Sequence, residues 1–210
     1  MSFALVSVSE EMPSAALFDI GNVILFFDFG KAARKIESLC PFSAEEIFQK
    51  VQPLTPPLER GELTPGEFFD HASQRIGYQG DRDFLRESFE DIFELNQPVV
   101  DWIEELDADG VPLFLLSNTN GIHVPFFESN YEVFSRFQGR IYSHEVGTMK
   151  PDREIYRITI ETLGIDPAQT IYIDDLPENC EAGSEAGLQA LHYDPANHAA
   201  IRQKGTASVS

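Results

Sequence analysis

The sequence contains few cysteines, few basic residues and no long apolar run, and each shortage excludes a class of protein. Its two cysteines, Cys40 and Cys180, show neither metal-site spacing nor a CxxC motif. A disulfide-stabilised secreted scaffold is therefore not expected, and a reducing compartment fits better. No apolar run approaches the roughly 20 residues of a membrane span, and the N-terminal stretch lacks the basic region of a signal peptide. We therefore predict a cytoplasmic protein with no membrane partner.

Basic residues are scarce beside acidic ones. The chain has 15 Lys and Arg against 35 Asp and Glu, which gives a formal net charge of −20 at pH 7. Such a surface repels the phosphates of nucleic acids, so a nucleic-acid partner is not expected. A small anionic substrate would need a local cation, either a metal ion or a placed lysine. Hydrophobic residues make up 42% of the 210, as in a globular chain that can form one core domain with a small lid.

Apolar runs alternate with amphipathic segments along most of the chain. Helices are expected near 99–108, 154–163 and 177–186, and buried strands at 15–18, 111–116, 141–142, 170–173 and 189–192. This alternation predicts an α/β fold with a doubly wound, Rossmann-type parallel sheet. The expected core domain comprises residues 15–29 and 98–197, and we expect flexible termini at 1–14 and 198–210.

Residues 30–97 interrupt this alternation. Their segments carry many charges and helical spacing, and no convincing strand separates them. Ser43 with Glu46, and Thr64 with Glu67, have the spacing of two capping boxes, which mark helix starts. We therefore predict that this stretch is an α-helical cap inserted between two strands of the core.

Polar residues follow several of the predicted strands at the point where each strand ends. They are Asp19, Ser117 and Asn118, Asp174 and Asp175, with Lys150 beyond a further strand. Each alone could be an ordinary turn residue or helix cap, but the carboxyl ends of parallel strands share one edge of a sheet. Clustered carboxylates raise one another's pKa unless a cation compensates them. A site for Mg²⁺ is therefore expected, and it suggests phosphoryl transfer.

Four motifs in this order resemble the haloacid dehalogenase-like superfamily. They are FDIGNV (18–23), LLSNTN (115–120), GTMKP (147–151) and YIDDLPEN (172–179). Each motif is weak alone, but the ordered set is specific and spans most of the chain. The helical insertion resembles the small cap of one branch of the superfamily. In detail, FDIGNVILFFDF, SNTNGIH and GTMKPDREIY are similar to the bacterial α-D-glucose-1-phosphatases.

This resemblance implies a role for each motif residue. Asp19 would be the nucleophile that becomes a phosphoaspartate, and Asp19, the Gly21 carbonyl and Asp175 would bind Mg²⁺. Lys150 would neutralise both the phosphate and Asp19, and Asp174 would support the site. Ser117 and the backbone N–H of Asn118 would bind the phosphoryl group. The implied substrate is a small phosphorylated metabolite, with a sugar phosphate favoured, while the sequence gives no indication of oligomeric state.

Gly21 departs from the pattern of most phosphatases in the superfamily. In those enzymes the residue two after the nucleophile is a second Asp, a general acid worth roughly 10²–10⁴ in rate. The sugar-phosphatase branch that the chain resembles also has Gly at this position. Either the substrate has a good leaving group, such as the anomeric oxygen of a sugar 1-phosphate, or another group transfers the proton. His123 is a candidate for that transfer, although an exposed histidine is the more ordinary interpretation.

Two other functions are compatible with parts of this pattern. A metal-independent haloacid dehalogenase would use the same aspartate to attack a carbon that bears a halide. The pair Asp174 and Asp175 argues against it, because that chemistry has no use for a Mg²⁺ site. A non-catalytic binding protein that has lost the general acid at Gly21 is the second alternative.

Overall fold

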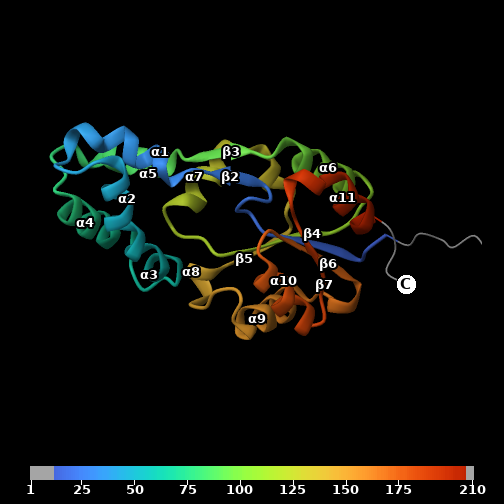
Figure 1. Ribbon diagram of the computed structural model, residues 1–210. Coiled ribbons are helices and arrows are strands. Elements are labelled where there is room, and N and C mark those ends of the chain that lie inside the picture. The colour runs from blue at the N-terminus through green and yellow to red at the C-terminus, as the bar shows by residue number, and fades with distance from the viewer. Residues whose placement is uncertain (1–11, 207–210) are drawn as a thin grey trace, which may run out of the picture.

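The computed structural model describes residues 12–206, so the predicted flexibility of residues 1–11 and 207–210 concerns segments outside the described residues. Its central sheet is parallel, with the strand order β5-β4-β1-β6-β7. The strands are β1 (Ala15–Phe18), β4 (Leu113–Ser117), β5 (Gly139–Tyr142), β6 (Thr170–Asp174) and β7 (Gln189–His192). The predicted doubly wound α/β core is therefore confirmed (Figure 1).

Helices cover both faces of this sheet (Figure 1). On one side lie α6 (Gln97–Ala108), α7 (His123–Asn130) and α11 (His198–Thr206), and on the other α9 (Arg153–Leu163) and α10 (Pro177–Glu185). Strand β1 is buried throughout: Ala16 and Phe18 belong to one apolar cluster, and Leu17 to the cluster on the opposite face. Because neighbouring side chains of a strand point to opposite faces, both layers of helices pack on β1 and fix its end.

The cap consists of helices at the other end of the molecule (Figure 1). They are α1 (Phe29–Ile36), α2 (Ala44–Val51), α3 (Thr55–Glu59), α4 (Pro65–Ile76) and α5 (Arg82–Glu90), with 3-10 turns at Glu37–Leu39 and Gln52–Leu54. Both predicted capping boxes form, at the starts of α2 and α4. The short helix α8 (Ser143–Val146), which follows β5, lies against α3.

A strand interrupts the block that we expected to be wholly helical. Strand β3 (Phe93–Leu95) pairs antiparallel with β2 (Leu25–Phe27), which follows the first motif. The expectation of no strand within residues 30–97 was therefore wrong. A strand of three residues is too short to show the alternation of apolar and polar side chains that marks a strand in a sequence. Its partner β2 also lies far from it in the sequence. In this β2–β3 ribbon, β2 leads from the core into the cap and β3 leads from the cap back to the core.

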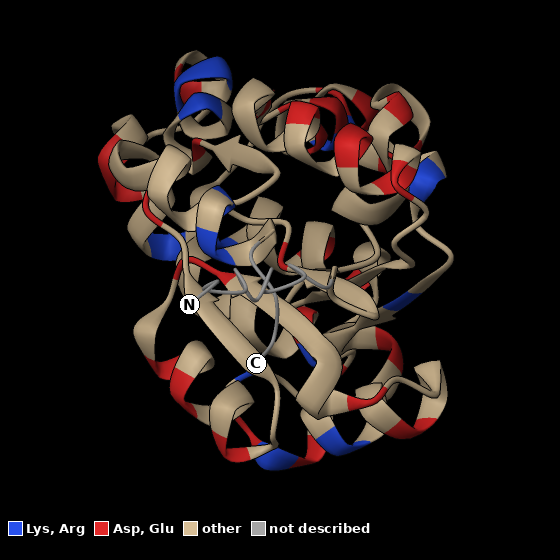
Figure 2. Ribbon diagram, turned by 90° about the vertical axis from the view of Figure 1, so that its right-hand side faces the viewer, with Lys and Arg blue, Asp and Glu red and all other residues tan. Residues whose placement is uncertain are grey.

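Residues 198–206 also differ from expectation, because the predicted flexible tail includes helix α11. Ile201 of this helix is buried, and a Cβ atom at Gly205 would lie 2.5 Å from the ring of Trp102 in α6. Tertiary packing rather than intrinsic helix preference thus holds α11 in place. Within residues 12–206, no helix has both the length and the apolarity that crossing a membrane needs. Figure 2 shows Asp and Glu on many helices, with Lys and Arg among them.

Candidate active site

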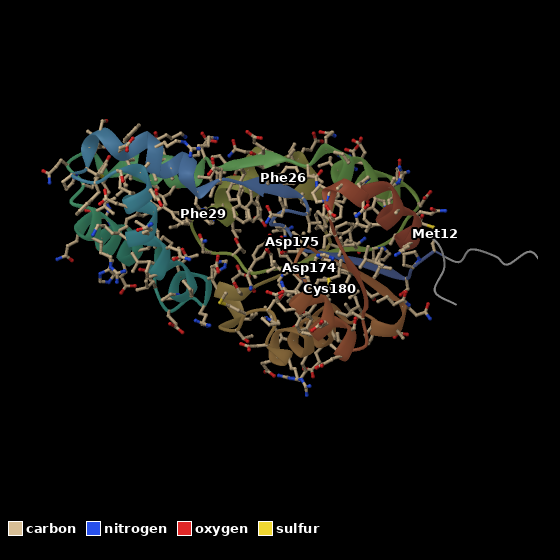
Figure 3. All side chains as sticks on the ribbon, in the orientation of Figure 1. Met12, Phe26, Phe29, Asp174, Asp175 and Cys180 are labelled. Carbon is tan, nitrogen blue, oxygen red and sulfur yellow. The ribbon has the colours of Figure 1, made fainter. Side chains whose placement is uncertain are left out.

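The three central strands bring the predicted polar residues to one edge of the sheet. Asp19 directly follows β1, Ser117 ends β4 and Asp174 ends β6, and β1 lies between the other two strands. All three side chains are buried. Figure 3 shows Asp174 and Asp175 between the sheet and the cap helices. The strand order therefore produces the juxtaposition that the sequence predicted.

Lys150 is the buried cation of this cluster. Its Nζ lies 2.9 Å from Asp19 Oδ1 and 2.6 Å from Asp174 Oδ2, and it also donates to the Leu116 carbonyl oxygen at 3.1 Å. Burial disfavours the ammonium, but the two carboxylates hold the pKa of Lys150 above its ordinary value. The lysine is therefore charged at neutral pH and faces the predicted nucleophile.

Asp174 uses both of its carboxylate oxygens within the protein. Oδ2 accepts hydrogen bonds from Lys150 and from the Tyr172 hydroxyl, both at 2.6 Å. Oδ1 accepts from Leu176 N–H and from Asn179 Nδ2, both at 2.9 Å. Burial raises the pKa of Asp174, but Lys150 and these donors outweigh it and hold the pKa below its ordinary value. Of the two supporting roles that the sequence left open, this geometry favours the orientation of Lys150.

Asp19 is held mainly by its ion pair with Lys150. Its Oδ1 is buried, and the ammonium of Lys150 lies 2.9 Å from it. Burial raises the pKa of Asp19 to about 6, against the opposing charge of Lys150. Oxygens of Asp19, Asp174 and Asp175 lie within 4.8 Å of one another. Three carboxylates around one ammonium leave a formal excess of two negative charges, which a divalent cation with oxygen ligands fits.

Asn22 connects the first motif to the last, a contact that the sequence analysis missed. Its Nδ2 donates to Asp175 Oδ2 at 3.0 Å. The residue has a φ of 53°, a left-handed conformation that Asn tolerates better than most residues. In this turn its N–H bonds the Leu25 carbonyl at 2.8 Å, at the start of β2. The asparagine of FDIGNV therefore holds Asp175 beside the loop that carries Asp19.

The loop after β4 holds Lys150 through its backbone. Asn118 donates from Nδ2 to the Lys150 carbonyl at 2.9 Å and accepts the Lys150 N–H at 2.8 Å. Ser143 binds the N–H and carbonyl of the next residue, Thr119, in the same reciprocal way. The hydroxyl of Ser117 makes no hydrogen bond within residues 12–206. Both polar atoms of the Asn118 side chain are thus bonded to the backbone of Lys150. The group of Asn118 that we expect to bind phosphate is therefore its backbone N–H.

Two further observations concern the missing general acid. A Cβ atom at Gly21 would lie 3.0 Å from Phe27 Cε1, so the aromatic ring of Phe27 occupies the space that a side chain at this position would need.

His123, the candidate for proton transfer, is buried rather than exposed. Its Nε2 lies 3.2 Å from the Phe89 carbonyl and its Nδ1 3.1 Å from Asn120 Nδ2. This arrangement fits a neutral ring that donates from Nε2, and burial lowers the pKa of His123 to about 4. The geometry thus disfavours His123 as the acid.

Glu59, the last residue of α3, is a candidate that the sequence analysis missed. Partial burial, with the negative charge of Asp19, raises the pKa of Glu59 to about 7, while Arg60 and Lys150 oppose the rise. Its carboxyl has no ion pair or hydrogen bond with the rest of the described chain. The cap therefore places a carboxyl within electrostatic reach of the nucleophile, and no local pattern in the sequence marks it.

A comparison with family models decides the class of the protein. The model described as haloacid dehalogenase-like hydrolase matches residues 13–187, which include all four motifs and the cap. The chain belongs to this family of hydrolases. The predicted resemblance is therefore confirmed, and the strand-end cluster lies where the family's motifs meet.

Two curated relatives of this haloacid dehalogenase-like hydrolase are named as phosphatases. The D-ribitol-5-phosphate phosphatase of Bacteroides thetaiotaomicron is 27% identical over 199 residues, which cover 90% of this chain and 95% of the relative. The sesquiterpene phosphatase of Aspergillus oryzae is 26% identical over 186 residues, covering 85% and 88%. A solved family enzyme from B. thetaiotaomicron, in complex with magnesium and inorganic phosphate, is 26% identical with a TM-score of 0.77. That match covers 88% of this chain and 96% of the other.

Proposed function

We propose that this protein is a Mg²⁺-dependent phosphatase that hydrolyses a small phosphorylated metabolite through a phosphoaspartate intermediate. The observation that carries the proposal is the buried carboxylate of Asp19, which is paired with the Lys150 ammonium and lies within 4.8 Å of oxygens of Asp174 and Asp175. The phosphatase names of the relatives and the magnesium and phosphate bound in the solved family enzyme support the same activity.

Each residue of the site has a separate role in the proposed reaction. An oxygen of Asp19 attacks phosphorus, and the bond from phosphorus to the ester oxygen breaks as that oxygen takes a proton. Water then attacks the phosphoaspartate, which releases phosphate and restores Asp19. Ser117 and the backbone N–H of Asn118 hold the phosphoryl oxygens, and Lys150 neutralises their charge. Mg²⁺ would be held by Asp19, the Gly21 carbonyl and Asp175, and when bound it supplies further charge neutralisation.

Phosphate release with and without Mg²⁺ tests this function. With p-nitrophenyl phosphate or acetyl phosphate, we expect turnover that falls more than about a hundredfold in EDTA and returns with added Mg²⁺. An Asp175→Asn variant should need more Mg²⁺ for half-maximal activity. Halide release from 2-haloacids without metal would instead support a dehalogenase. Neither activity, in a folded protein, would support a non-catalytic binding protein.

The substrate of the enzyme is open between two chemical classes that the relatives' names suggest. A sugar phosphate is what the sequence resemblance implies, and the ribitol-5-phosphate phosphatase supports it. The sesquiterpene phosphatase, at nearly the same identity, supports a hydrocarbon phosphate. Because the reacting group is the same in both, the cap rather than the strand ends must distinguish them.

We also propose that Glu59 supplies the proton that Gly21 cannot. A general acid matters most for a poor leaving group, so Glu59→Gln should lower kcat/KM for n-butyl phosphate by roughly 10²–10⁴. The same variant should change kcat/KM for p-nitrophenyl phosphate only a few-fold, since that leaving group needs no proton. The acid is protonated below about pH 7. Wild-type kcat/KM for butyl phosphate should therefore fall above this pH, and the variant should lose that dependence.

A neighbouring exposed carboxylate provides the matched control for this prediction. Glu62→Gln changes the charge by the same amount three residues further along the chain, after the end of α3, and should leave both rates unaltered. An equal loss on both phosphates in Glu59→Gln would show that Glu59 acts on binding or stability and not as an acid.

A further inference from the structure

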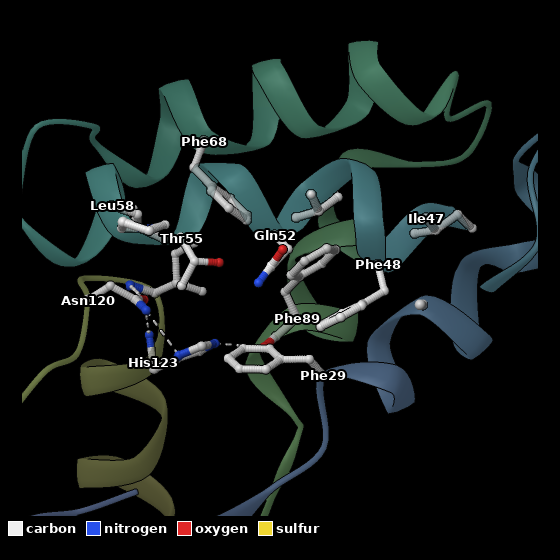
Figure 4. A pocket seen from close by; sticks show the side chains of 14 residues that line it. Phe29, Ile47, Phe48, Gln52, Thr55, Leu58, Phe68, Phe89, Asn120 and His123 are labelled. Atoms are coloured by element: carbon white, nitrogen blue, oxygen red, sulfur yellow. Dashed lines mark hydrogen bonds between the residues drawn. The ribbon is translucent and has the colours of Figure 1, made fainter. Parts of the chain in front are cut away.

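A pocket of about 250 Å³ with mainly apolar walls lies between the cap helices and residues 120–123 of the core. Figure 4 shows the rings of Phe29, Phe48, Phe68 and Phe89 around it, with Leu58 on the cap side. No charged residue is among those that line it. Such a lining gains free energy when it takes an apolar group out of water.

The polar side chains at the core side of this pocket are already paired. Asn120 accepts the backbone N–H groups of Ile122 and His123 on its Oδ1, at 3.0 and 3.1 Å. Its Nδ2 contacts His123 Nδ1, and the other ring nitrogen of His123 contacts the Phe89 carbonyl. The dashed lines in Figure 4 mark these contacts. Gln52 and Thr55 are the remaining polar side chains of the lining. A polyol that entered would lose hydrogen bonds to water with few replacements.

Two of the residues that line the pocket are connected to the reaction centre. Asn120, which lines the pocket, lies in the loop after β4, three residues beyond Ser117 at the end of that strand. On the other side, Phe27 covers Gly21, and its ring packs on that of Phe29 at 5.1 Å between centroids. Phe29 itself lines the pocket. An ester whose phosphorus lies at Asp19 can therefore extend its organic part past these rings into the cap.

We propose that the pocket binds the leaving group of the substrate, and that this group is an apolar hydrocarbon alcohol, as in a terpenoid or alkyl monophosphate. This inference rests on the proposed phosphatase function. It also predicts that the sugar phosphates favoured by the sequence resemblance are poor substrates, because the lining offers few partners for their hydroxyls.

A series of n-alkyl phosphates tests the inference against polyol phosphates with an equally basic leaving group. From ethyl to octyl phosphate, kcat/KM should rise by up to about fourfold for each methylene that the pocket buries. Octyl phosphate should exceed glucose 6-phosphate and ribitol 5-phosphate, all of which are esters of primary alcohols. A flat series, or a preference for the polyols, would overturn the inference while Mg²⁺-dependent hydrolysis of acetyl phosphate kept the proposed function intact. Loss of acetyl phosphate hydrolysis as well would instead count against the function.

Two exposed phenylalanines of the cap provide a matched pair of variants. Phe48 lines the pocket, whereas Phe84 lies on α5 outside it, and the two are 39% and 42% exposed. Phe48→Ser should reduce the ratio of octyl to ethyl phosphate kcat/KM by at least about tenfold, and Phe84→Ser should leave that ratio unchanged. Equal ratios in both variants and the wild type would show that the alkyl chain binds elsewhere.

Discussion

Replacing Asp19 by Asn should lower kcat by about 10⁴-fold or more while the protein stays folded. The amide has nearly the shape of the carboxylate, but it is not a nucleophile, and covalent catalysis without its nucleophile loses most of its rate. Burial disfavours ionised Asp19, whose pKa of about 6 exceeds its ordinary value of 3.8. Between pH 3.8 and about 6 the folded state therefore binds more protons at Asp19 than the unfolded state, so stability falls as the pH rises through this range and the loss is complete above it. The variant, which does not ionise at this position, should be no less stable than wild type at pH 7.5 in EDTA.

Single-turnover kinetics and thermal unfolding measure these two effects. Asp109→Asn, at an exposed position after α6, is the control and should match wild type in rate and in melting temperature. Asp19→Asn protein that is folded and retains more than about a tenth of the wild-type rate would exclude Asp19 as the nucleophile.

Lys150→Met is expected to affect both activity and stability. Without the ammonium, the buried carboxylates of Asp19 and Asp174 both lose the cation that neutralises them. Removing one partner of a buried ion pair typically costs about 3–5 kcal/mol of unfolding free energy. The loss of phosphate neutralisation should also lower kcat about 10²–10³-fold.

Urea unfolding at several pH values shows whether the cost comes from the two carboxylates. In the variant their pKa values should rise, so the folded state takes up protons and regains stability as the pH falls from 8 to 5. Lys204→Met, on the exposed surface of α11, should cost little at any pH. A loss of stability in Lys150→Met that does not change with pH would mean that packing and not charge is responsible.

The sequence predicted the parts of the site that depend on strand ends. Asp19, Ser117 and Asp174 each follow an apolar run, and a parallel sheet must place such positions at one edge. The sequence could not show which of Asp174 and Asp175 orients Lys150 and which is free to bind the metal. That difference depends on the hydrogen bonds that Tyr172 and Asn179 donate to Asp174, which form only in the folded chain.

Contacts between distant segments account for what the sequence analysis missed. Glu59 approaches Asp19 only because α3 packs at the junction of cap and core, and its surroundings in the sequence are those of any surface helix. Strand β3 is too short to show periodicity, and α11 depends on packing against Trp102. His123 was expected on the surface because its burial comes from the cap residue Phe89.

The β2–β3 ribbon makes the cap a separable module. Its strands leave and re-enter the core side by side, so Phe27 and Phe93, which flank the cap helices in the sequence, are paired at about the 5 Å spacing of neighbouring strands. A cap of different length or lining could be exchanged between Phe27 and Phe93 without moving β1, β4 or β6. In this architecture, exchanging the insert would replace both the apolar pocket and the proposed acid Glu59, while Asp19, Lys150 and Asp174 would keep their places at the strand ends.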